Sequence, residues 1–270
     1  MTRRMLVRPP AVAGRFYPAD PVRLAAAVDD YVAAATTAGA LPKALVVPHA
    51  GYVYSGPVAG SGYRLLRGAA DRVTRVVLLG PAHYVAVRGL AVSSAEGFET
   101  PLGVVPVDAA ARDEALARSS WVEVDDRVHA PEHSLEVHLP FLQRVLGGVP
   151  VLPLVVGGAP DAATAEVLEL WWDDPATVVI VSSDLSHYES YEVARSRDER
   201  TAAAVVALDA DHLSDHDACG AYPLRGLLRI AAARGATAQL LDLRSSGDTA
   251  GPRDRVVGYG AFAVGAGRAA

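Results

Sequence analysis

The chain has 270 residues and a formal net charge of −6, with 51% hydrophobic and 21% charged residues. This composition is typical of a globular protein with a sizeable core, and its acidic balance gives no support to a nucleic-acid-binding surface. No apolar run reaches the roughly 18 residues of a membrane span, no apolar segment follows the basic start MTRRMLVRPP, and the single cysteine excludes an intramolecular disulfide. We therefore expect a cytoplasmic protein without membrane or nucleic-acid partners.

Seven apolar runs of strand length follow one another along the chain. Their β-branched and apolar residues occupy consecutive positions, which is typical of strands covered on both faces. The runs are 43–49, 73–81, 89–94, 149–158, 177–183, 237–243 and 255–264.

Helical patterns lie between several of these runs. Asp108 and Asp161 stand where an N-cap residue is expected, and Gly235 stands where the last helix should stop. The alternation of strands and helices predicts an α/β fold, with a single domain over residues 1–270 and a mainly parallel or mixed sheet flanked by helices on both faces. The predicted helices are 108–119, 134–146, 161–172, 198–213 and 222–235.

Three of the predicted strands each deliver a histidine just past their C-terminal end. His49 follows the first, His83 follows the second, and Asp184 and His187 follow the strand over 177–183. In open α/β sheets, sites form outside the carboxyl ends of the strands. A lone histidine there is more often a hydrogen-bonded turn residue, but three at one edge indicate a metal site or a proton-transfer site.

The stretch APEHSLEVHLPFL, residues 130–142, is the densest polar cluster. His133 and Glu136 are three residues apart and could share one helix face, so we expect both to line the pocket. His138 is five residues from His133 and is interpreted as structural. The remaining histidines are expected at the surface: His129, His212 and His216.

Cys219 comes just before the predicted helix over 222–235. A thiol at a helix N-terminus lies near partial positive charge, which lowers its pKa and favours the thiolate that a metal or an electrophile needs. The alternative is a small buried apolar residue.

Seven motifs occur in the order in which the Memo family carries them, over about residues 8–265. The chain therefore resembles this family, named for the mediator of ErbB2-driven cell motility, whose prokaryotic branch is called AmmeMemoRadiSam system protein B. The motifs are AVAGRFYPAD, PHAGYVYSG, GPAHY, EHSLEVHLPFL, SSDLSHY, CGAYP and SGDTAGPRDRVVGYGAFAV.

The resemblance implies a fold like the catalytic subunit of class III extradiol dioxygenases, which use non-haem iron. It implies metal ligands at His49, His83 and Cys219, with Asp184 and His187 beside them. A thiol would then replace the carboxylate ligand of the dioxygenases, which shifts metal preference toward copper(I), zinc or low-potential iron.

The resemblance also implies aromatic groups near the pocket at Phe16 and Tyr54. Iron or copper is the expected metal, with zinc as the alternative. The prokaryotic name implies a radical-SAM protein and an Ammecr-domain protein as partners. Animal members are described as docking a phosphotyrosine peptide, a role that we do not extend to a chain that looks bacterial.

Three functions remain open from the sequence. The first is a metal-dependent redox enzyme or oxygenase-like protein acting on a small molecule, with His187 as general acid or base and Asp184 orienting it. The second is a metal-free cysteine hydrolase-type enzyme that uses Cys219, His187 and Asp184. The third is a non-catalytic module that binds a ligand or peptide in the same pocket.

Overall fold

The computed structural model describes residues 5–266. Its centre is a nine-stranded mixed sheet in the order β10-β12-β2-β9-β3-β8-β4-β7, with β11 paired to β12. The strands are β2 (Ala44–Val47), β3 (Arg75–Pro81), β4 (Leu90–Val92), β7 (Val122–Val124), β8 (Val151–Val156), β9 (Thr177–Ser182), β10 (His187–Glu189), β11 (Ala236–Ser245) and β12 (Val256–Ala266). A smaller sheet pairs β1 (Val7–Arg8), β5 (Gly97–Thr100) and β6 (Gly103–Pro106).

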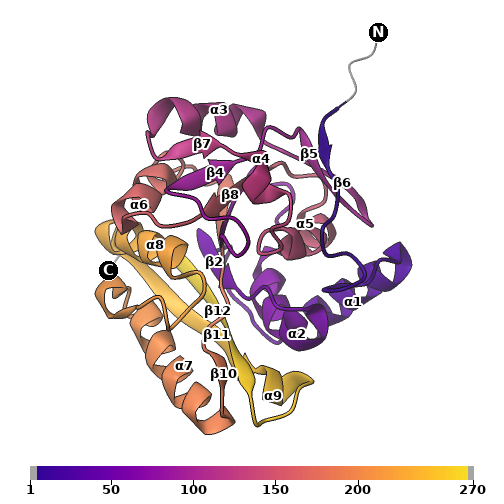
Figure 1. The fold of residues 1–270 in the computed structure, drawn as a ribbon, viewed down its shortest axis with the longest axis vertical. Helices are drawn as coiled ribbons and strands as arrows, with labels where there is room; N and C mark the ends of the chain where they lie inside the picture. The colour runs from indigo at the N-terminus through magenta and orange to yellow at the C-terminus, as the bar shows by residue number, and fades with distance from the viewer. Residues whose placement is uncertain (1–4, 267–270) are drawn as a thin grey trace.

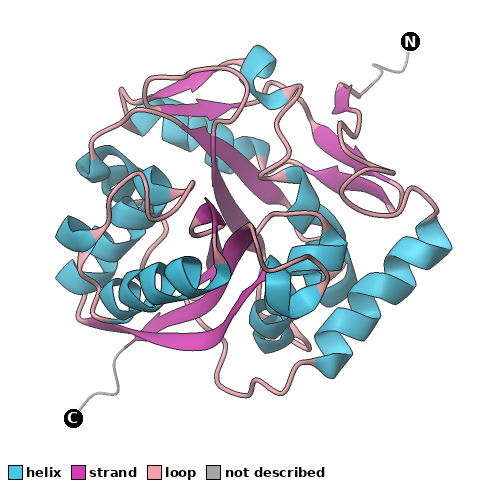
Figure 2. Ribbon diagram, turned by 60° about the horizontal axis from the view of Figure 1, so that its bottom comes forward, coloured by secondary structure: helices cyan, strands magenta, loops and turns pink. Residues whose placement is uncertain are grey.

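Helices cover both faces of the large sheet (Figures 1 and 2). In Figure 1, α6, α7 and α8 lie to the left of the central strands, and α1, α2 and α5 lie to the right. The helices are α1 (Pro21–Ala34), α2 (Tyr52–Tyr63), α3 (Ala109–Arg118), α4 (Asp126–His129), α5 (Leu139–Leu146), α6 (Asp161–Glu169), α7 (Tyr191–Val206), α8 (Ala221–Ala233) and α9 (Ser246–Thr249). Short 3-10 turns are η1 (Arg64–Leu66), η2 (Glu136–His138) and η3 (Ala210–His212). None of the helices within residues 5–266 is both long and apolar enough to cross a lipid bilayer.

Two buried cores lie on opposite faces of the sheet. Along β3, Val77 and Leu79 belong to the core under α6 and α8, whereas Val76 and Leu78 belong to the core under α1, α2 and α5. Successive strand residues point to opposite faces, so a strand buried on both faces is apolar at consecutive positions. This confirms the predicted α/β fold with helices on both sides, and all seven predicted strands are present.

The middle of the sheet is parallel, and its order positions the site. Strand β9 pairs in parallel with both β2 and β3, although the chain forms β2 and β3 first and reaches β9 about a hundred residues later. Because parallel strands end at the same edge, the segments after β2, β3 and β9 emerge next to one another. Strand β12 pairs with β2 in the antiparallel direction, and β4 also pairs with β8 in the antiparallel direction. The sheet is therefore mixed.

One predicted N-cap is wrong. Asp108 caps α3 by accepting the backbone N–H of Ala111, as expected, but α6 has Pro160 at its N-cap and no side-chain cap. The side chain of Asp161 instead accepts a hydrogen bond from Nε of Arg225 on α8, at 2.8 Å. The carboxylate of Asp161 therefore links α6 to α8 and does not cap α6.

Candidate metal centre

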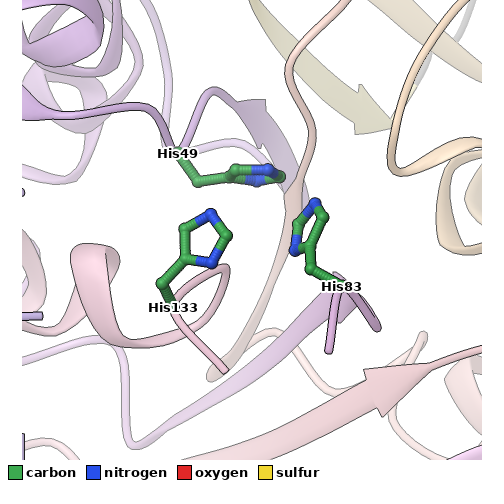
Figure 3. Close-up of side chains that lie close together, drawn as sticks. All are labelled: His49, His83 and His133. Atoms are coloured by element: carbon green, nitrogen blue, oxygen red, sulfur yellow. The ribbon is translucent and has the colours of Figure 1, made fainter. Parts of the chain in front are cut away.

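Three histidine side chains come together at the carboxyl edge of the parallel strands. His49 follows β2, His83 follows β3, and His133 precedes η2. Their ligand nitrogens all lie within 4.8 Å of one another, and within residues 5–266 this is the only such group of three or more histidine, cysteine or acidic side chains. Figure 3 shows one ring nitrogen of His83 and one of His133 directed toward the His49 ring. The ring centroids are 4.6–5.5 Å apart.

Glu132 orients His83. One carboxylate oxygen accepts the backbone N–H of His83 at 2.7 Å, and the other accepts the ring Nδ1–H at 2.9 Å. The carboxylate also accepts the backbone N–H groups of His133 and Ser134, both at 2.9 Å. Burial opposes ionisation, but these hydrogen bonds outweigh it and hold the pKa of Glu132 down to about 2. The carboxylate is therefore ionised and can only accept a hydrogen bond from Nδ1–H of His83. In this tautomer the lone pair of Nε2 is free to bind a metal.

His49 is fixed from three sides. Its backbone N–H donates to Oδ1 of Asp184 at 2.7 Å, its ring Nδ1 lies 2.6 Å from Oγ of Ser182, and its Nε2 lies 3.2 Å from the sulfur of Cys219. The side chain is only 2% exposed. Burial, followed by the charges of the neighbouring histidines, holds its pKa well below the usual value.

His133 completes the group. Its Nδ1 lies 3.3 Å from Oε1 of Glu132 without forming a hydrogen bond, and its ring packs against Phe16 at a centroid distance of 4.7 Å. Burial lowers the pKa of His133 to about 4, although Glu132 opposes the shift.

The donor set fits a transition metal ion. His49 and His133 are neutral at physiological pH, and a neutral imidazole is the form that binds a metal. His83 is more exposed than His49 and leaves one side of the group open, as catalytic metal sites do. The residues present could therefore hold one transition metal ion.

Cys219 lies next to this group rather than within it. Its sulfur contacts Nε2 of His49 at 3.2 Å and accepts the backbone N–H of Asp184 at 3.2 Å. The expected lowering of its pKa by the start of α8 is wrong, because burial and then the Asp184 carboxylate raise the pKa of the thiol far above its usual value. The free-energy cost of removing the thiolate from water is larger here than the stabilisation that the partial positive charge at the helix start provides.

Asp184 and His187 lie beside the three histidines, as expected for residues that follow the predicted strand over 177–183. Burial raises the pKa of Asp184 to about 6, and the hydrogen bond from the His49 backbone and the charge of His187 both oppose that rise. His187 is exposed, and its ring Nδ1 donates to the carbonyl of Leu185 at 2.8 Å. Its Nε2 is consequently the atom that can exchange a proton with solvent or a ligand.

Glu136 and His133 do not face a common pocket. Glu136 is fully buried and accepts hydrogen bonds from the guanidinium of Arg8, the hydroxyl of Tyr17, and the backbone N–H groups of Ala11 and Val12. Its carboxylate therefore anchors the N-terminal segment that carries Phe16. The expected sharing of a helix face fails because residues 133–135 precede η2 and the regular helix α5 begins only at Leu139.

The other histidines divide between core and surface. His138 is buried and contacts Oγ of Ser182 at 2.8 Å, in agreement with a structural role, and His212 and His216 are exposed as expected. The surface position expected for His129 is wrong. It is 1% exposed, packs against Phe98 and contacts the carbonyl of Ala91 through Nε2 at 2.9 Å.

Phe16 and Tyr54 line a cleft of about 520 Å³. Phe16 also contacts His133, so its ring links the wall of this cleft to the histidine group. Tyr54 is 40% exposed at the start of α2. The wall also includes Arg15, Arg23 and Tyr31.

Comparisons with known proteins identify the family. A family model described as Memo-like protein matches residues 8–263. The chain belongs to the Memo family. The MEMO1 family protein of Ignicoccus hospitalis is 38% identical, over 95% of this chain and 98% of that relative, and the MEMO1 family protein of Aquifex aeolicus is 37% identical, over 94% and 98%. The crystal structure of an uncharacterized Escherichia coli K12 protein, JW3007, covers 81% of this chain and 98% of its own, with a TM-score of 0.51 and 16% identity, and shows similarity of fold alone.

Two site residues of this Memo-like protein were missed from the sequence. Glu132 opens the motif EHSLEVHLPFL, directly before His133, and an acidic residue next to a histidine predicted to line the pocket is the available signal. Ser182 is the first polar residue after the apolar run of β9, but nothing in the sequence indicates that its hydroxyl meets His49.

Proposed function

We propose that this Memo-like protein is a metal-dependent oxidoreductase whose ion is held by His49, His83 and His133. The observation that supports the proposal is the convergence of three imidazole nitrogens within 4.8 Å of one another. Imidazole ligands suit iron, copper and zinc. Iron or copper is proposed first because the function requires electron transfer, and zinc, which has no redox chemistry, is the alternative.

The bound ion would supply Lewis acidity and, as iron or copper, one-electron redox capacity. The protein's own residues prepare the place for it. Glu132 holds the ring of His83 in orientation, and Ser182 does the same for His49. Phe16 packs on His133 and limits the access of water from that side.

His187 and Asp184 are proposed to handle protons at the open side. With Nδ1–H committed to the carbonyl of Leu185, His187 has Nε2 available to take a proton from a substrate or return one. Asp184 is buried, and its carboxylate accepts the backbone N–H of His49 at 2.7 Å, which places a second proton-bearing group at the same edge of the site. This pair is the basis for proposing catalysis rather than binding alone.

We propose that Cys219 stands beside the ion in contact with His49, and acts neither as a ligand nor as a nucleophile. Its sulfur is 3.2 Å from a ligand nitrogen, which places it at the edge of the site. The cysteine-hydrolase alternative has lost support for two reasons. The imidazole in contact with the thiol is His49 and not His187, and the pKa of the thiol is raised instead of lowered.

The substrate is proposed to be a small molecule that reaches the site from its open side, where His83 is exposed. A radical-SAM protein and an Ammecr-domain protein are proposed as partners, on the basis of the family resemblance. A binding module without turnover would use the same pocket, and only a measured reaction separates the two functions.

The test is anaerobic purification followed by elemental analysis of the wild-type protein and of His49→Ala, with His212→Ala as a surface control. We expect nearly one iron or copper per chain in the wild type and the control, and background levels in His49→Ala. Oxygen uptake by the reduced, metal-loaded protein then tests redox activity. A wild type without any metal, even after anaerobic reconstitution, would overturn the proposal.

A further inference from the structure

We infer that Ser182 is a positioning residue that sets the tautomer of His49, fixing the proton on Nδ1 and leaving the lone pair of Nε2 directed at the site. This inference rests on the proposed function only where it concerns metal affinity. The tautomer itself is a property of the metal-free protein.

The argument starts from the three contacts of one hydroxyl. Oγ of Ser182 lies 2.7 Å from the backbone carbonyl of Ser134, 2.6 Å from Nδ1 of His49 and 2.8 Å from Nε2 of His138. A hydroxyl has one proton to donate and two lone pairs that accept. A carbonyl only accepts, so the single proton of Ser182 goes to Ser134.

The remaining two contacts are therefore fixed in direction. Both imidazoles must donate to the lone pairs of Ser182, so His49 carries its proton on Nδ1 and His138 carries its proton on Nε2. The opposite assignment at His49 would place two acceptors 2.6 Å apart, or would turn the hydroxyl away from the carbonyl of Ser134 and leave two acceptors 2.7 Å apart. Either arrangement costs an unsatisfied polar group in the interior.

Water cannot take over this role because the network is sealed. Ser182 and Ser134 are fully buried, His138 is 1% exposed and His49 is 2% exposed. Ser182 is the last residue of β9, so the backbone of the central sheet holds its hydroxyl in place. A ligand atom held this way loses little freedom when an ion arrives, which is how groups behind a metal ligand raise affinity.

An unpaired ring nitrogen of His138 is consistent with this assignment. Its Nδ1 is buried and has no hydrogen-bond partner among the described residues. The tautomer that serves Ser182 therefore leaves an unpaired acceptor in the core, a feature that is uncommon and calls for a reason. Satisfying Ser182, and through it His49, provides that reason.

The direct test is nitrogen-15 NMR of the histidine rings in the metal-free wild-type protein. Single substitution of each histidine assigns the signals. We expect the pattern of a neutral ring protonated on Nδ1 for His49, and protonated on Nε2 for His138. A His49 ring protonated on Nε2 in this protein would overturn the inference, whether or not the protein binds any metal.

Substitutions then test whether Ser182 is the cause. Ser182→Ala should shift His49 toward the tautomer with the proton on Nε2 and weaken zinc binding, used as a spectroscopically silent probe against a chelator, by about 10- to 100-fold. Ser182→Thr keeps the hydroxyl and should restore the tautomer. Ser61→Ala is the matched control, because that serine is also buried but its hydroxyl donates to Asp242 and contacts no histidine.

The outcomes separate the two proposals. A folded Ser182→Ala protein with unchanged His49 tautomer and unchanged zinc affinity would contradict this inference and leave the proposed metal site intact. A wild type that shows the expected tautomers but binds neither zinc, iron nor copper would contradict the proposed function instead. If Ser182→Ala does not fold, the tautomers measured in the wild type still decide the matter.

Discussion

Glu132 holds His83 by two hydrogen bonds at once, accepting its backbone N–H at 2.7 Å and its ring Nδ1–H at 2.9 Å. The first bond fixes the chain after β3, and the second fixes the rotation and the tautomer of the ring. A carboxylate behind a histidine is a common means of orienting a metal ligand and raising its basicity. Ser182 does for His49 what Glu132 does for His83, so two of the three histidines have a partner that directs Nε2 toward the site.

Replacing Glu132 by glutamine should weaken metal binding. The amide can still accept one hydrogen bond, but its NH2 group would oppose a donor, either the backbone N–H or the ring N–H of His83. We expect zinc affinity to fall by about 10- to 100-fold in a chelator competition assay. Glu123→Gln, on the exposed side of β7, is the control. Equal affinity for the Glu132→Gln protein and the control would show that the carboxylate does not orient the ligand.

Cys219 should react slowly with alkylating reagents in the metal-free protein. The thiolate is the reactive form, and burial together with the Asp184 carboxylate raises the pKa of this thiol. Mass spectrometry with iodoacetamide at pH 7.5 should therefore show modification well below the rate of a free cysteine. Rapid modification that is insensitive to chelators would revive the hypothesis of a cysteine nucleophile.

Removing the Glu136 carboxylate should act on stability rather than on metal affinity. Glu136→Ala leaves the buried guanidinium of Arg8 without its negatively charged partner and the hydroxyl of Tyr17 without its acceptor. Breaking a buried pair on one side costs about 3–5 kcal/mol in the free energy of unfolding. Denaturant titration measures this loss, and hydrogen exchange should show residues 8–17 losing protection first. A change below about 1 kcal/mol would mean that the carboxylate is not the anchor of this segment.

Asp198 should make stability fall as the pH rises. Its carboxyl accepts hydrogen bonds from the backbone and hydroxyl of Ser186, and burial raises its pKa to about 6 from an ordinary value of 3.8. The native state therefore holds a proton that the unfolded chain has lost between these two pH values, so unfolding becomes easier as the pH rises through that window. Between pH 4 and pH 7, wild-type stability should drop by on the order of 2–3 kcal/mol relative to Asp198→Asn.

Denaturant unfolding of both proteins at pH 4, 5, 6 and 7 measures this difference. Taking the difference between wild type and variant cancels the titration of distant groups. A flat difference, or one that favours the wild type as the pH rises, would contradict the assigned direction of the shift.

The sheet could be predicted from the sequence because each central strand is apolar at consecutive positions, a pattern that few other structures produce. Helix α2 could not be predicted, since Gly56, Pro57 and Gly60 disfavour a helix locally. The structure supplies the reason for its glycines. A Cβ atom on Gly60 would lie 2.5 Å from the carbonyl oxygen of Tyr31, so close packing against α1 requires the missing side chain. Tertiary contact outweighs local propensity here.

The site could be predicted only in part for a similar reason. His49, His83 and Asp184 are visible because each follows a strand, and parallel strands share an edge. His133 reaches the same point from a loop between α4 and η2, and no periodicity in the sequence reports that path. The position of β9 between β2 and β3 could not be predicted either, because the order of strands depends on packing between segments far apart in the chain.

The central claim is that His49, His83 and His133 share one ion while Cys219 stands beside it. Metal content per chain, measured by elemental analysis after anaerobic reconstitution and removal of loosely bound ions, tests this most directly in His133→Ala and Cys219→Ala. We predict that His133→Ala falls to background and that Cys219→Ala retains most of its metal. Full occupancy in His133→Ala together with complete loss in Cys219→Ala would contradict the assignment.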